Sequence, residues 1–89
     1  MEIVVEDVFF IREAGLASFA VSVGQPGYEL KEGWYYLRIR GIPVEKLWIE
    51  GEDFLSPSNA RFRSLSTRDF DKVVAHAFGE HAWTLEPLE

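Results

Sequence analysis

Apolar and polar residues alternate with a period of two along much of this chain, which is the pattern of β-strands with one buried face. The clearest alternation runs from Ala17 to Val23, with Phe19, Val21 and Val23 on one side. The segment 2–11 differs, because most of its residues are apolar. Such a run is typical of a strand that is covered on both faces, or of one that bends across a barrel.

A β-hairpin is predicted in the middle of the chain, with strands Trp34–Arg40 and Val44–Glu50 joined through Gly41-Ile42-Pro43. If Arg40 lies opposite Val44, Tyr36 pairs with Trp48 and Arg38 pairs with Lys46. One face of the hairpin then carries apolar side chains for a core: Tyr35, Leu37, Ile39, Leu47 and Ile49. The other, which we name the hairpin face, carries aromatic and basic side chains: Trp34, Tyr36, Arg38, Arg40, Lys46 and Trp48.

The last third of the chain contains the one segment with a helical period. Loops are predicted at 51–53 and 56–59, followed by a shorter strand at Ala60–Leu65. The segment 67–78 fits a helix, with Ser66 or Thr67 as N-cap and Gly79 after its end. Its apolar stripe would consist of Phe70, Val73, Val74, Ala77 and Phe78. The alternative is an irregular strand; the local signals favour the helix.

These elements predict a mainly β fold. We expect a small closed or partly open antiparallel barrel of about six strands, with one short helix near residues 67–78. At 89 residues the chain is expected to form a single domain, 1–89, because chains this short rarely build two cores.

Composition excludes several classes of protein. The chain has no cysteine, so disulfide scaffolds and cysteine-ligated metal sites are excluded. Its start lacks the basic region and apolar stretch of a signal peptide. No apolar run approaches the roughly 18 residues needed to cross a bilayer. We therefore expect a cytoplasmic protein that is not inserted in a membrane.

The net charge of −6 argues against generic binding to nucleic acid, since such a protein repels phosphate at long range. The charges are unevenly distributed, however. Six of the nine basic residues fall within 34–70, whereas ten of the fifteen acidic residues fall outside that stretch. The middle of the chain is therefore the place to look for an anion-binding surface.

Several short motifs together resemble the second-domain β-barrel of the translational GTPases, such as elongation factor Tu and initiation factor 2. The motifs are Val5-Glu6-Asp7-Val8-Phe9, Gly15, Gly24 with Leu30-Lys31-Glu32-Gly33, Arg61-Phe62-Arg63-Ser64-Leu65, and Ala77-Phe78-Gly79-Glu80-His81-Ala82-Trp83-Thr84-Leu85. The chain departs from the family at Phe19 or Ala20, where a glycine is usual, and at Trp34, where an acidic residue is preferred. The resemblance implies a barrel whose first and last strands are neighbours.

The resemblance does not extend to nucleotide chemistry. The chain has no Gly-x-x-x-x-Gly-Lys-Ser/Thr loop and no room for a GTPase domain. We expect no bound nucleotide and no cofactor.

The hairpin face, extended by Arg61 and Arg63, is the leading candidate binding site. Aromatic rings interleaved with cations suit single-stranded RNA, whose bases stack on the rings while cations track the phosphates. In a second interpretation the segment 67–78 covers this face, with Phe70, Val73 and Val74 packed on Trp48 and Tyr36. A third is a contact with an acidic protein, since Trp, Tyr and Arg are enriched at interface centres.

Catalytic and metal sites find less support. Acidic and histidine side chains gather near the C-terminus: Asp69, Asp71, His76, Glu80 and His81. Neither aspartate has the i, i+4 spacing to His76 that clamps an ion on a helix, so caps and surface histidines explain them better. A triad of Ser64 or Ser66, a histidine and Asp69 lacks a Gly-x-Ser-x-Gly elbow. We expect no metal and no catalytic residue.

The sequence therefore predicts a non-enzymatic binding module that contacts a protein or single-stranded RNA through the hairpin face. The alternative is a structural subunit or homo-oligomer, since thirteen aromatic residues exceed what so small a barrel encloses. A small hydrolase or metal enzyme that uses His76 or His81 is a distant third.

Overall fold

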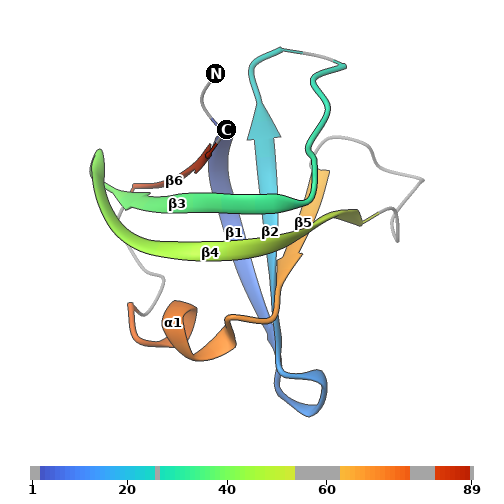
Figure 1. The fold of residues 1–89 in the computed structure, drawn as a ribbon, viewed down its shortest axis with the longest axis vertical. Coiled ribbons are helices and arrows are strands. Elements are labelled where there is room, and N and C mark those ends of the chain that lie inside the picture. Colours follow the sequence, from blue (N-terminus) through green and yellow to red (C-terminus); the bar gives the residue numbers. More distant parts are fainter. Residues whose placement is uncertain (1–2, 26, 54–62, 77–81, 89) are drawn as a thin grey trace.

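Six strands form a closed antiparallel ring in the computed structural model, which describes residues 3–25, 27–53, 63–76 and 82–88 (Figure 1). The elements are β1 (Ile3–Ile11), a 3₁₀ turn (Arg12–Ala14), β2 (Leu16–Val23), β3 (Gly33–Ile39), β4 (Ile42–Asp53), β5 (Arg63–Thr67), α1 (Phe70–Val74) and β6 (Trp83–Pro87). Around the ring the order is β1-β2-β5-β4-β3-β6. The predicted fold class, a small six-stranded barrel with one short helix, is confirmed.

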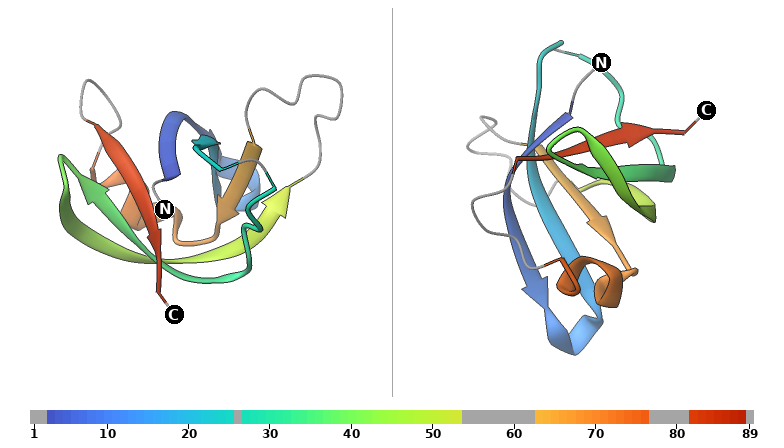
Figure 2. Two further views of the ribbon diagram at one scale, coloured as in Figure 1. Left: turned by 90° about the horizontal axis from the view of Figure 1, so that it is seen from above. Right: turned by 90° about the vertical axis from the view of Figure 1, so that its left-hand side faces the viewer.

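The first and last strands of the chain are neighbours, as the resemblance implied. Ile3 pairs with Leu85 and Val4 with Thr84, so the contact uses the very start of β1. A bulge at Glu6 then bends β1, and the rest of the strand pairs with β2 alone among the described strands. β1 and β2 thus extend together beyond the barrel, toward the turn that joins them (Figures 1 and 2).

This bend explains why β1 is so apolar. The interpretation of a strand covered on both faces is wrong for its second half, because Phe9 is 53% and Ile11 is 45% exposed. The alternative of a bent strand fits, since a bulge lets one strand serve the barrel first and then leave it.

The β3–β4 register differs from the predicted one by two residues from Trp34 to Leu37, and by three at Arg38, beyond a register shift between Leu37 and Arg38. Arg38 pairs with Pro43, Tyr36 with Lys46 and Trp34 with Trp48. The turn consists of Arg40 and Gly41, which both have positive φ (54° and 80°), as a two-residue type I′ turn requires. The predicted pairs were therefore wrong. A shift of two leaves side chains on their predicted face, and the irregularity near the turn takes up the third residue.

β4 continues through the residues predicted as a loop at 51–53. Gly51 has a φ of +98°, and the ladder to β5 shifts register between Ile49 and Glu52. The glycine thus bends a continuous strand instead of ending it. Within the described residues β5 runs from Arg63 to Thr67, so it continues two residues beyond the predicted end at Leu65. Residues 60–62 lie outside the described part.

The helix is real but shorter than predicted. It covers Phe70–Val74, so the irregular strand is wrong for these residues. Its N-cap is Asp69, since Thr67 belongs to β5 and cannot begin a helix. Val73 is fully buried, whereas Val74 is 38% exposed and lies outside the stripe. The predicted stripe residues Ala77 and Phe78, and Gly79 beyond them, lie outside the described residues.

The core lies inside the ring and is closed at one end by α1 (Figure 2). β2 supplies Ala17, Phe19 and Val21, all with no exposed surface. Of the predicted inward positions Phe19, Val21 and Val23, the last is only partly buried and packs at the margin of the core. Other large, fully buried side chains come from the remaining elements: Ile3, Leu37, Leu47, Ile49, Leu65, Val73, Trp83 and Leu85. Since these side chains fill the interior, candidate binding residues must be sought on the outside.

Candidate binding surface on the hairpin face

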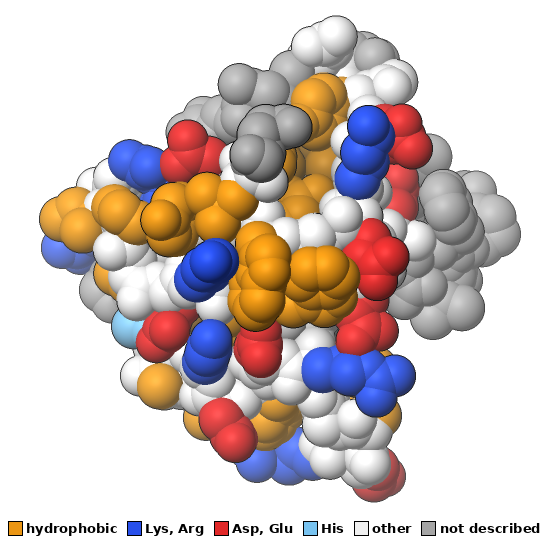
Figure 3. All heavy atoms as spheres, viewed as in Figure 1, with side chains coloured by type: hydrophobic (Ala, Val, Ile, Leu, Met, Phe, Trp, Pro, Cys, Tyr) orange, Lys and Arg blue, Asp and Glu red, His pale blue; other side chains and the backbone are white. Residues whose placement is uncertain are grey.

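The hairpin face lies on the outside of β3 and β4, because its residues alternate with buried ones. Tyr35, Leu37 and Leu47 point into the core, which turns the residues between them outward. Three aromatic side chains are accordingly exposed: Trp34 (42%), Tyr36 (36%) and Trp48 (36%). Figure 3 shows hydrophobic side chains gathered in the middle of this side of the molecule, with charged groups around them.

The two tryptophans form a pair across the strands. Trp34 and Trp48 are directly opposite, with ring centroids 5.2 Å apart and ring planes at 79°, an edge-to-face contact. Lys46 Nζ lies over the Trp34 ring, 4.9 Å from its centroid, within the range of a cation–π interaction. The structure thus brings together three of the predicted site residues in one contiguous cluster.

The two arginines of the hairpin face differ. The Arg38 guanidinium is neutralised, since Nη1 lies 2.6 Å from a Glu86 carboxylate oxygen and Nη2 donates to the Gly41 carbonyl. Arg40 is held through its backbone, where its amide donates to the Ala82 carbonyl at 2.8 Å. Its side chain has no carboxylate partner among the described residues. Only Lys46 and Arg40 therefore offer an unneutralised cation on this face, as far as the structure describes it.

The predicted extension by Arg61 and Arg63 is not part of the same cluster. Arg63 donates from Nε and Nη2 to both carboxylate oxygens of Glu52, each at 2.7 Å, at the opposite end of β4 from the hairpin turn. The bond to Glu52 raises the pKa of the Arg63 guanidinium above its usual value. Arg63 thus ties β5 to the bulged end of β4, and Arg61 lies outside the described residues.

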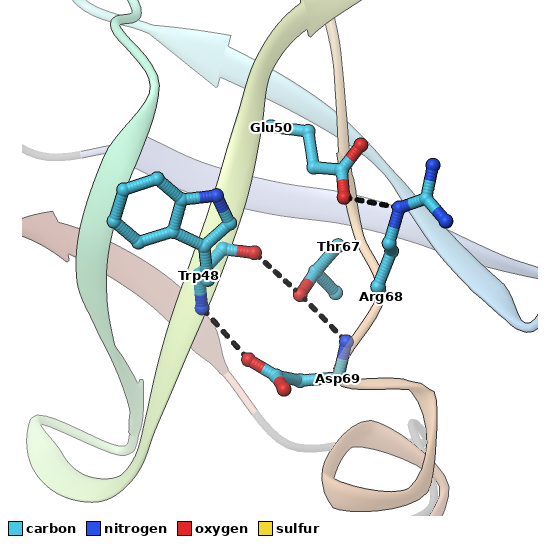
Figure 4. A network of polar contacts seen from close by, with 5 residues as sticks. All are labelled: Trp48, Glu50, Thr67, Arg68 and Asp69. Carbon is cyan, nitrogen blue, oxygen red and sulfur yellow. Dashed lines mark hydrogen bonds and ion pairs between the residues drawn. The ribbon is translucent and has the colours of Figure 1, made fainter.

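The segment before the helix supports the hairpin face from its edge (Figure 4). An Asp69 carboxylate oxygen accepts a hydrogen bond from the Trp48 amide at 2.8 Å, and Thr67 Oγ1 donates to the Trp48 carbonyl at 2.7 Å. Lys72 Nζ donates to the Lys46 carbonyl at 3.0 Å. Side chains therefore take the place of a neighbouring strand along this part of β4, where β5 does not pair with it.

The helix does not cover the aromatic side chains. Val73 points into the core, and Phe70 packs edge-to-face on Phe10 at 5.4 Å. The interpretation in which Phe70 and Val73 pack on Trp48 and Tyr36 is thus wrong. Because the hydrogen bonds of Asp69 and Thr67 hold the segment at the edge of β4, its apolar residues turn toward the barrel end.

Sequence reasoning missed the acidic residues around the hairpin face. Glu50 Oε2 accepts from Arg68 Nε at 2.6 Å, and Glu86 pairs with Arg38. Glu50 could have been found, because it lies two residues after Trp48 on the same strand. Glu86 could not, since it is 48 residues from Arg38 and only β6 brings it close.

The residues considered for catalysis and metal binding are held apart. His76 Nε2 lies 3.0 Å from Glu45, Asp69 binds the Trp48 amide, and Ser64 Oγ contacts Ser18 Oγ at 3.1 Å. Within the described ranges no group of three or more acidic or histidine side chains could hold a metal ion. Glu80 and His81 lie outside these ranges.

Comparisons with known proteins give no relative: no family model matches the chain, and neither a curated protein nor a solved structure does. In the part of the chain that the structure describes, no helix is long and apolar enough to span a membrane.

Proposed function

We propose that the protein is a non-enzymatic binding module that captures a protein partner on the hairpin face. The observation that carries the proposal is the exposed Trp34–Trp48 pair, with Lys46 over one of its rings. Aromatic side chains flanked by a cation are typical of the centres of protein interfaces. The pair lies on two hydrogen-bonded strands, so it is held in place before the partner arrives.

A protein fits this face better than single-stranded RNA. Arg38 and Arg68 are each neutralised by a glutamate, which leaves few free cations to track phosphates. The Trp34 ring already has Lys46 over it, which limits base stacking there. The fold-level resemblance to the second barrel of translational GTPases agrees with a binding role as an analogy only.

The test compares two single variants that each truncate an exposed apolar side chain. The tagged wild type, Trp48→Ala and Val74→Ala are used to capture partners from the source cells, with and without ribonuclease. Trp48→Ala should lose the partner, because loss of an interface centre weakens binding roughly 30-fold or more. Val74→Ala is the control, since it truncates an exposed apolar side chain (38%) on α1, outside the hairpin face.

Three outcomes would contradict the proposal. A partner that Trp48→Ala retains would show that the hairpin face is not the site. A partner lost only in Val74→Ala would place the site on α1. If ribonuclease abolished capture, the partner would be RNA and not a protein.

Self-association through the same face is the second candidate, favoured by the apolar surface at the hairpin tip. Ile42 is 63% and Val44 is 36% exposed, so the apolar surface continues beyond the tryptophans. Light scattering at micromolar concentration should then give a species larger than the 10.2 kDa chain. Trp48→Ala should restore the monomer; a wild-type monomer would exclude this candidate.

A further inference from the structure

A second surface lies on β1, where one edge of the strand has no neighbour in the described part of the fold. β1 pairs with β2 along its length, but with β6 only at Ile3 and Val4. From Asp7 to Ile11, no described strand pairs with the other side, which we name the free edge of β1 (Figure 1). Unpaired backbone groups along an edge are a template for an added strand.

One hydrogen bond shows which backbone groups point to the free edge. The Val8 amide donates to its neighbour, an Asp7 carboxylate oxygen, at 2.8 Å. Because backbone groups alternate in direction along an antiparallel strand, Val8 and Phe10 turn theirs outward, while Phe9 turns its own toward β2. A carboxylate thus serves the outward amide of Val8, but the residue before Phe10 is apolar and offers no such acceptor.

The edge of β4 differs from the free edge of β1. Where β5 does not pair with β4, the side chains of Thr67, Asp69 and Lys72 bind the backbone of Trp48 and Lys46. On β1, the side chain of Asp7 alone plays this part among the described residues. Among the described residues, the free edge of β1 thus has fewer side-chain partners than the edge of β4.

The side chains around this edge define what could bind. On the inner side, Phe10 is packed against Phe70. On the outer side, Phe9 and Ile11 are exposed and give an apolar row. Exposed carboxylates stand at both ends of the row, from Glu6, Asp7 and Glu13. The cation of this region, Arg12, lies over the Phe70 ring, 5.8 Å from its centroid.

We propose that the free edge of β1 accepts an extended segment of another protein, which adds as a strand and carries basic residues on both sides of an apolar row. The Phe10 amide and the carbonyls of Val8 and Phe10 supply the hydrogen bonds, since the Val8 amide already binds Asp7. Phe9 and Ile11 supply the apolar contact. The carboxylates attract the basic ends. A second copy of this chain fits poorly, because two such edges would bring the carboxylates of both copies together.

The experiment uses the ¹⁵N-labelled full chain and a synthetic peptide of alternating valine and threonine with lysines at both ends. Binding should slow hydrogen exchange of the Phe10 amide at least tenfold and leave the Trp48 amide unchanged. Replacing the lysines by glutamates should weaken binding at least tenfold.

Two N-methylated peptides give the decisive control. One carries methyl groups on the odd residues and the other on the even residues, so each blocks one edge of the peptide. If the peptide adds as a strand, one of them should lose at least tenfold in affinity and the other should bind as before. Equal binding by both, protection of the hairpin face instead of Phe10, or no binding at millimolar peptide would overturn the proposal. Protection of Phe10 by the protein alone at rising concentration would overturn the choice of partner.

Discussion

Tyr35 shows how one side chain in the core responds to pH. It is 3% exposed, and its hydroxyl donates to the Lys31 carbonyl at 2.7 Å. Burial raises the pKa of Tyr35 above the usual 10.0, Tyr28 raises it further, and the bond to Lys31 opposes them. The folded state therefore holds the proton more tightly than the unfolded state does.

The consequence is a loss of stability at alkaline pH. Once the pH rises above the ordinary tyrosine pKa of about 10, the unfolded chain loses this proton first, so ionisation favours unfolding. Tyr35→Phe should cost about 1 kcal/mol near neutral pH through the lost hydrogen bond. The difference in unfolding free energy between wild type and Tyr35→Phe should then become smaller above about pH 10. Urea unfolding of both proteins from neutral pH to above about pH 10 measures this difference. A difference that does not change with pH would contradict the role given to Tyr35.

At the scale of elements, Thr67 joins β5, β4 and the start of α1. It has no exposed surface, and its hydroxyl donates to the Trp48 carbonyl and accepts from the Asp69 amide at 3.1 Å. One buried hydroxyl therefore fixes where β5 ends and where the helix can begin. The same contacts keep the helix at the edge of β4 and leave the hairpin face exposed.

Thr67→Val keeps the shape of this side chain and removes its hydroxyl. Two backbone groups then lose their partner, so the free energy of unfolding should fall by about 1–3 kcal/mol. Thr67→Ser, which keeps the hydroxyl and loses a methyl group, is the matched control and should retain the Asp69 amide signal in its folded position. Equal stability of the valine variant and wild type in denaturant unfolding would contradict this role.

At the scale of the molecule, β6 decides whether the sheet is a ring or an open sheet. It pairs with β3 on one side and with β1 on the other, and Leu85 lies opposite both Leu37 and Ile3. Since Leu85 is 1% exposed, its side chain also belongs to the core. Closure therefore rests on a short strand near the end of the chain.

Leu85→Ala should destabilise the protein by about 2–5 kcal/mol, because it leaves a cavity at the point of closure. The control Ile42→Ala changes a residue that is 63% exposed at the hairpin tip, and should stay within about 0.5 kcal/mol of wild type. Thermal unfolding of both variants measures the difference. Similar melting temperatures for the two would show that β6 does not carry the closure.

Local pattern accounts for most of what the sequence determined. Alternation along β2 and the hairpin assigned Phe19, Val21, Tyr35 and Leu37 to the core and Trp34 and Trp48 to the surface, because strand side chains repeat every two residues. The same rule made the assignment survive a register error of two residues. The helix was found from its stripe, although its N-cap was placed too early.

Tertiary structure decided everything that depends on residues distant in sequence. The salt-bridge partner of Arg38 is on β6 and that of Arg63 is on β4. A pattern of neighbouring residues therefore predicts neither pair. Gly51 has a positive φ where β4 bends and its ladder to β5 shifts register. In the part of the chain that the structure describes, the free edge of β1 arises because β6 pairs with it only at Ile3 and Val4. Periodicity thus predicted which way the side chains of β2, β3 and β4 point, whereas closure of the ring decided which charges are neutralised and which edges of the described strands lack a neighbour.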